Sequence, residues 1–125
     1  MQYAILELEV AAKKAGLRIE KPPVLRGRSG VEHRFSLLAS EGPTLVGVDV
    51  YDSPTEVDVI RTFVKKWDTS SECFIYLGSG DASEGAKRLA RAYGLRILGE
   101  KDLWEGFSPL AAPNSARQAI RSVPQ

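Results

Sequence analysis

Residues 45–51 read Leu45-Val46-Gly47-Val48-Asp49-Val50-Tyr51 and form the most strand-prone stretch of this 125-residue chain. β-branched residues at every second position predict a strand that places three valines on one face and Gly47, Asp49 and Tyr51 on the other. Residues 31–38 alternate in the same way, and the turn Glu41-Gly42-Pro43 lies between the two segments. We therefore expect these two strands to form a hairpin.

Upstream of this hairpin, residues 3–15 carry apolar side chains at three- and four-residue spacing and are followed by Gly16, which predicts a helix. Residues 17–28 are interrupted by Pro22 and Pro23, so we expect an edge strand or an extended arm there. His33 alternates with Phe35 toward the apolar face, and we expect a hydrogen-bonded structural histidine rather than a ligand.

Downstream, Ser53 is a candidate N-cap, with Pro54 at the first helical position and Glu56 three residues after the cap. The helix that follows is predicted to bury an apolar stripe of Val57, Ile60, Val64 and Trp67. A short apolar run at 73–77 predicts a buried parallel strand, and residues 83–94 and 95–98 predict a helix and a last strand.

This order of elements predicts an α/β fold, an α-β-β-β-α-β-α-β sandwich in which helices cover the faces of a central mixed sheet, over residues 1–105. Residues 106–125 are expected to be a tail or to hold a short docking helix at 115–123. Trp104 and Phe107 follow the last strand, where they would either mark an interface if exposed or be buried beneath the tail.

The composition narrows the class of protein. With 43% hydrophobic and 26% charged residues the chain is typical of a soluble globular domain. Its single cysteine, Cys73, and single histidine, His33, exclude a disulfide scaffold and a zinc site of Cys and His ligands. The apolar runs are short and broken by charge, so we expect a cytoplasmic protein with no membrane partner.

The net charge of +1 hides a local separation of charge. Residues 13–34 hold seven basic residues against Glu20 and Glu32, whereas residues 35–60 hold five acidic residues and no basic one. Arginine forks and glycine-rich backbone suit phosphate groups, although the same residues could be a solvated loop that keeps an edge strand from pairing. The candidate nucleic-acid-binding residues are Arg26, Arg28, Ser29 and Arg34.

A family resemblance rests on three segments of the sequence. They are residues 30–39, Val46-Gly47-Val48-Asp49-Val50-Tyr51 and residues 83–98. The chain resembles the PD-(D/E)XK restriction-endonuclease-like superfamily, which includes archaeal Holliday-junction resolvases and Mrr-type nucleases, over roughly residues 3–103. It is more weakly similar to the archaeal TBP-interacting proteins, whose domain of this fold is implicated in binding a transcription factor.

The resemblance implies two carboxylates on adjacent strands that hold a divalent metal, and a lysine that positions water. This chain has Ser36, Asp49 and Tyr51 at those positions. We therefore expect a non-catalytic module without a cofactor that binds nucleic acid or a protein of the transcription or repair machinery and that can form a homodimer. The alternative is a Mg²⁺-dependent endonuclease with a displaced site of Glu9, Glu32 and Asp49, in which Glu32 and Asp49 hold the metal.

Overall fold

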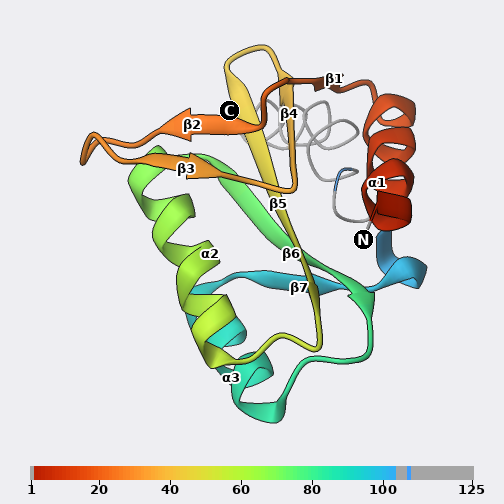
Figure 1. Ribbon diagram of the computed structural model, residues 1–125, viewed down its shortest axis with the longest axis vertical. Coiled ribbons are helices and arrows are strands. Elements are labelled where there is room, and N and C mark those ends of the chain that lie inside the picture. The colour runs from red at the N-terminus through yellow and green to blue at the C-terminus, as the bar shows by residue number, and fades with distance from the viewer. Residues whose placement is uncertain (1, 104–106, 108–125) are drawn as a thin grey trace, which may run out of the picture.

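The computed structural model describes residues 2–103 and residue 107. Its centre is a five-stranded mixed sheet of order β1-β4-β5-β6-β7, in which β1, β4 and β5 are antiparallel neighbours and β5, β6 and β7 are parallel (Figure 1). The predicted α/β sandwich with a central mixed sheet is confirmed. The strands are β1 Arg18–Ile19, β4 Leu37–Glu41, β5 Thr44–Asp52, β6 Glu72–Ser79 and β7 Arg96–Leu98.

Helices cover both faces of this sheet. α1 (Gln2–Lys14) lies on one face, and α2 (Glu56–Thr69) and α3 (Glu84–Tyr93) lie on the other (Figure 1). A short 3-10 turn, η1 (Glu100–Asp102), follows β7. No helix in the described part of the chain is long and apolar enough to cross a membrane.

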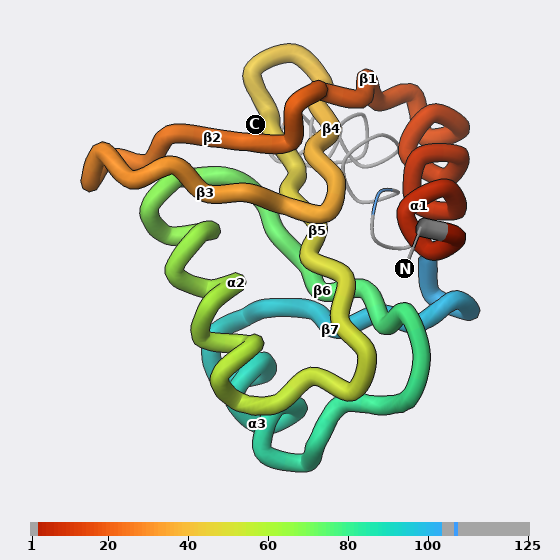
Figure 2. Tube along the Cα trace, in the orientation of Figure 1, coloured from red at the N-terminus to blue at the C-terminus, as the bar shows by residue number. Residues whose placement is uncertain are grey.

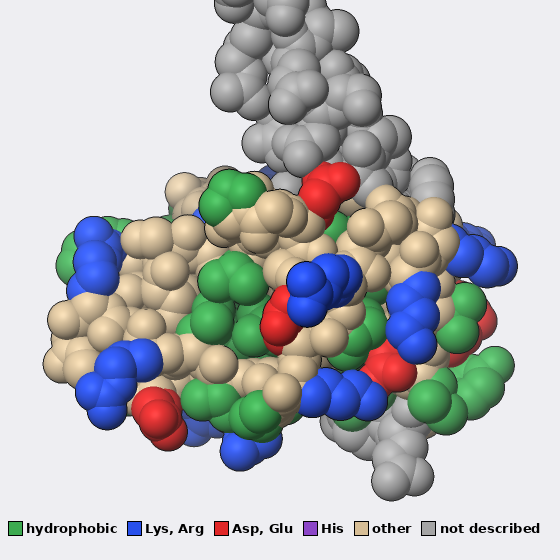
Figure 3. All heavy atoms as spheres, turned by 90° about the horizontal axis from the view of Figure 1, so that it is seen from above, with side chains coloured by type: hydrophobic (Ala, Val, Ile, Leu, Met, Phe, Trp, Pro, Cys, Tyr) green, Lys and Arg blue, Asp and Glu red, His purple; other side chains and the backbone are tan. Residues whose placement is uncertain are grey.

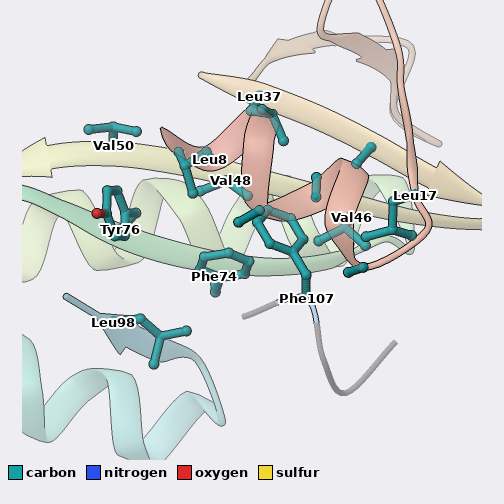
Figure 4. Packing of buried hydrophobic residues seen from close by; sticks show 14 of the residues in the cluster. Leu8, Leu17, Leu37, Val46, Val48, Val50, Phe74, Tyr76, Leu98 and Phe107 are labelled. Atoms are coloured by element: carbon teal, nitrogen blue, oxygen red, sulfur yellow. The ribbon is translucent and has the colours of Figure 1, made fainter. Parts of the chain in front are cut away.

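The alternation of β5 is the one that the sequence predicts. Val46, Val48 and Val50 belong to the core between the sheet and α1, whereas Asp49 is buried on the α2 side. β6 contributes Phe74 to the α1-side core (Figure 4). The Phe74 and Phe107 rings pack edge to face, with 5.3 Å between ring centroids, and Phe107 is fully buried.

Phe107 is therefore a core residue and not part of an exposed interface. Its ring lies among the side chains between α1 and the sheet (Figure 4), just beyond the domain boundary predicted at residue 105. Trp104 and the predicted docking helix at 115–123 lie outside the described residues.

The strand predicted at 31–38 is wrong as a single strand. Its first part, β3 (Glu32–Arg34), pairs with β2 (Val24–Arg26) in a separate two-stranded hairpin, and its second part is β4. The chain changes sheets at Phe35, whose backbone N–H donates to the carbonyl of Pro23, while the next amide donates to Val48. Phe35 consequently packs on the α2 side and Leu37 on the α1 side, although they are two residues apart.

The hairpin of β4 and β5 is present as predicted. Glu41 pairs with Thr44, so only Gly42 and Pro43 form the turn, and Gly42 has a φ of 58° that favours glycine. The third helix also begins and ends as predicted: the Ser83 hydroxyl accepts from the Ala86 amide at 3.0 Å, and Gly94 closes α3 in the left-handed region.

The start of α2 differs from the prediction. Its N-cap is Thr55, and Asp58 accepts the Thr55 backbone N–H at 2.9 Å in a capping box. Ser53, the predicted cap, lies in the left-handed region with a φ of 52° and precedes the helix. A capping residue needs an extended backbone, which Thr55 has, and this moves the helix start by two residues.

The predicted buried stripe of α2 is also wrong. Val57, Ile60, Val64 and Trp67 are between 43% and 66% exposed, whereas Val59 and Thr62 are fully buried. The helix therefore turns a partly polar face to the sheet and an apolar face outward. The polar face is needed because Thr62 and Lys65 of this helix bind the buried carboxylate of Asp49.

Burial on α1 gives a direct test of the fold. Leu8 is fully buried in the α1-side core and Leu6 is 58% exposed on the same helix. Leu8→Ala is expected to lower the free energy of unfolding by about 3 kcal/mol, because it removes buried methyl groups and leaves a cavity. Leu6→Ala should change it by less than about 0.5 kcal/mol. Urea unfolding followed by circular dichroism measures both, and equal losses would contradict the placement of α1.

Candidate functional site

The three positions that the family resemblance singles out lie close together, along β5 and just before β4. Asp49 and Tyr51 lie two residues apart on β5, and Ser36 precedes β4 beside them. The Ser36 hydroxyl accepts the backbone N–H of Val50 at 3.0 Å. Burial and then the neighbouring Asp49 charge raise the pKa of Tyr51. The structure thus brings together Ser36, Asp49 and Tyr51, and only one of the three is a carboxylate.

Both carboxylate oxygens of Asp49 are occupied by side chains of α2. The Thr62 hydroxyl donates to Oδ2 at 2.6 Å, and Lys65 Nζ donates to Oδ1 at 3.0 Å. The two donors are three residues apart and therefore share one face of the helix. Because Asp49 is only 4% exposed, this ion pair is shielded from solvent on the carboxylate side.

Lys65 makes further contacts that hold its ammonium group in place. It donates to the backbone carbonyl of Arg34 at 2.6 Å and lies 5.2 Å from the centre of the Phe35 ring. The lysine thus joins α2, β5 and the end of β3. The sequence prediction missed Thr62 and Lys65, because the apolar stripe of α2 pointed to the opposite face of the helix.

The carboxylates of the displaced-site alternative do not come together. Glu9 lies on α1, across the sheet from Asp49, and faces Lys21 at 3.5 Å. Glu32 is exposed on β3. Among residues 2–103 and 107, no group of three or more His, Cys, Asp or Glu side chains is arranged to hold a metal ion. The structure therefore does not assemble Glu9, Glu32 and Asp49 into a metal site.

A second polar cluster lies at the carboxyl end of α2, where the β2–β3 hairpin crosses it (Figure 2). Asp68 accepts the Ser29 amide at 2.9 Å, the Ser29 hydroxyl at 2.6 Å and His33 Nε2 at 2.8 Å. Gly27 makes this approach feasible, because a Cβ there would lie 1.9 Å from the Asp68 carboxylate. The hydrogen bonds from the Ser29 hydroxyl and from His33 lower the pKa of Asp68 to about 2.

Ser29, His33 and Asp68 are the residue types of a hydrolase triad, but their geometry is different. In a triad the serine hydroxyl hydrogen-bonds to the histidine, which in turn hydrogen-bonds to the aspartate. Here both Ser29 and His33 contact the same Asp68 oxygen. The cluster therefore anchors the hairpin, and the expectation that His33 is a hydrogen-bonded structural residue is confirmed.

The hairpin divides the predicted nucleic-acid-binding residues into two groups. Ser29 is committed to Asp68, and the Arg28 guanidinium lies 5.0 Å from the centre of the Trp67 ring and donates to the Trp67 carbonyl. Arg26 and Arg34 are exposed, and neither forms an ion pair with any residue that the structure describes. Only these last two guanidinium groups are fully available to a ligand.

Comparisons with known proteins add a fold likeness. No family model matches the chain, and neither does any curated protein. A solved structure, the protein of unknown function AF1548, superposes with a TM-score of 0.62 at 15% sequence identity, over 76% of this chain and 56% of that one. This chain thus spans little more than half the length of that protein. The likeness shows a shared α/β fold.

The Asp49–Lys65 pair generates a stability prediction. Lys65→Met would leave a buried carboxylate with only Thr62 as a partner, and is expected to lower the free energy of unfolding at neutral pH by about 3 kcal/mol. The double variant Asp49→Asn with Lys65→Met removes both charges and should recover most of that loss. Lys66→Met, at the next position of α2, is the control and should cost less than about 1 kcal/mol. Urea unfolding measures all three; a Lys65→Met effect no larger than the control would contradict the pairing.

The Asp68 anchor generates a pH prediction. Because the pKa of Asp68 is about 2 when folded and ordinarily 3.8, its ionised form stabilises the fold above about pH 4, and this stability is lost as the pH falls toward 2. Asp68→Asn should therefore lower the urea midpoint at pH 7, and the gap from the unsubstituted chain should close between about pH 4 and pH 2. When both proteins also carry Ser29→Ala, the difference in urea midpoint should be smaller, because the Ser29 hydroxyl no longer stabilises the ionised Asp68. A gap that does not change with pH would rule out the low pKa.

Proposed function

We propose that this chain is a non-catalytic binding domain of restriction-endonuclease-like ancestry that engages the phosphate backbone of nucleic acid. The observation that carries the proposal is the state of Asp49, whose two oxygens are taken by Thr62 and Lys65 inside the protein. A metal ion at Asp49 would have to displace the Lys65 ammonium group and would find Ser36 and Tyr51 where a second carboxylate and a lysine are needed.

The β2–β3 hairpin supports a phosphate-binding role. In its register Leu25 pairs with His33, and both face α2: Leu25 packs against the α2-side core and His33 reaches Asp68. Arg26 and Arg34 are out of phase with this pair, so their side chains point to the other face of the hairpin. Basic side chains stand at the left end of Figure 3, where the hairpin lies.

The anchoring of the hairpin is relevant to binding. The Asp68 bonds to Ser29 and His33 and the Lys65 bond to the Arg34 carbonyl hold the turn and β3 against α2. A backbone that is already ordered loses less conformational entropy when its arginines bind phosphate. Glu32 lies opposite Arg26 and moderates the positive charge, which favours a few phosphate contacts rather than an extended basic surface.

Nucleic-acid binding is tested by fluorescence anisotropy with labelled duplex, branched and single-stranded oligonucleotides over a range of salt. The double variant Arg26→Ala with Arg34→Ala should bind at least about tenfold more weakly in low salt and should lower the slope of log K against log salt by about 2, one for each phosphate contact. Arg88→Ala with Arg91→Ala on α3 removes the same charge elsewhere and is the control. Equal losses in the two double variants would contradict a role for the hairpin, and absence of binding at low salt would rule out the proposal.

The same preparations test the endonuclease alternative. Incubation with Mg²⁺ or Mn²⁺ and each oligonucleotide should leave the substrates intact. Cleavage that Asp49→Ala abolishes would show that catalysis depends on Asp49 and would replace the proposed function by the nuclease.

A further inference from the structure

The outward face of α2 carries a continuous apolar stripe. The α2 stripe consists of Val57, Ile60, Val64 and Trp67, which are 55%, 43%, 47% and 66% exposed. Spacings of three, four and three residues place these side chains on one face of the helix. An exposed apolar row that includes a tryptophan is typical of a protein interface.

We propose that the α2 stripe binds the α2 stripe of a second copy of this chain in an antiparallel, twofold pairing. The spacing of the stripe is the same when it is read from either end. An antiparallel pair therefore places Val57 against the partner subunit's Trp67, and Ile60 against the partner subunit's Val64, with both contacts made twice. Self-complementarity of this kind is the requirement for a twofold interface.

The charges at the two ends of α2 favour the antiparallel direction. The first turn contains Glu56, next to Val57, and Asp58. At the other end of the stripe the exposed Arg28 guanidinium lies 5.0 Å from the centre of the Trp67 ring. Antiparallel pairing brings the acidic end of each helix to the basic end of the other, whereas parallel pairing would bring like charges together.

The apolar surface continues from α2 onto α3. Phe63 stacks on Tyr93 with 4.3 Å between ring centroids, and Tyr93 is 37% exposed. A stable interface buries about 800 Å² on each partner, more than one short helix stripe supplies, so the neighbouring surface of α3 would be needed. We expect a dimer that dissociates in the micromolar range. The pairing does not use Arg26 or Arg34, so it stands independently of the proposed nucleic-acid binding.

Sedimentation equilibrium over a wide concentration range tests the interface. The unsubstituted chain should be a concentration-dependent dimer, and Val64→Asp should weaken dimerisation at least about a hundredfold, because it places two carboxylates in an apolar contact. Leu6→Asp, which changes an exposed residue of α1, is the control and should leave the dimer intact. Circular dichroism checks that both variants fold.

Disulfide trapping tests the direction of the pairing. Ile60→Cys and Val64→Cys variants, one of them carrying a tag that changes its size, are mixed and mildly oxidised. Antiparallel pairing predicts that the mixed disulfide exceeds both homodisulfides. The native thiol contributes little background, because Cys73 is buried and burial raises its pKa to about 11.

Three outcomes would overturn the proposal. A monomer at every concentration up to the millimolar range would assign the α2 stripe to another partner. A dimer that Val64→Asp weakens no more than Leu6→Asp would place the interface elsewhere. A dominant homodisulfide of the Ile60→Cys variant would show a parallel pair. None of these results affects the oligonucleotide measurements with the Arg26 and Arg34 variants, so the two proposals fail separately.

Discussion

The burial of one carboxylate organises this domain. Asp49 lies in the middle of the central strand β5 and is almost inaccessible to water. A charge in that position is strongly destabilising unless it is paired and hydrogen-bonded, and α2 provides both with Lys65 and Thr62. To do so, the helix must turn its polar face to the sheet. Its apolar row is then left facing outward.

The same helix also positions the β2–β3 hairpin. Lys65 contacts the backbone of Arg34 at the end of β3, and Asp68 binds the neighbouring His33 and also Ser29 in the turn of the hairpin. Two internal polar clusters, three residues apart along α2, thus join the sheet, the helix and the hairpin. The exposed arginines of the hairpin and the exposed stripe of α2 are consequences of one arrangement, although they point to different classes of ligand.

Several features could be predicted from the sequence because they depend on neighbouring residues. The alternation of Val46, Val48 and Val50, the Ser83 cap and the Gly94 stop are local patterns, and the structure has each of them. The pairing of β4 with β5 also followed from the turn predicted between them. The strand break at Phe35 was missed, because period-two alternation does not show where a chain passes from one sheet to another.

The sequence by itself determined which residues of α2 share a face, but not which face meets the sheet. Helical periodicity defines the stripe of Val57 and Ile60 and the opposite row of Thr62 and Lys65 with equal clarity. Hydrophobicity alone favours burying the first row. Only the tertiary structure shows that the row of Thr62 and Lys65 faces the sheet. Asp49 reaches α2 from a distant part of the chain, and its charge requires a partner. Leaving this carboxylate buried and unpaired would cost about 3 to 5 kcal/mol, a cost that Lys65 and Thr62 remove.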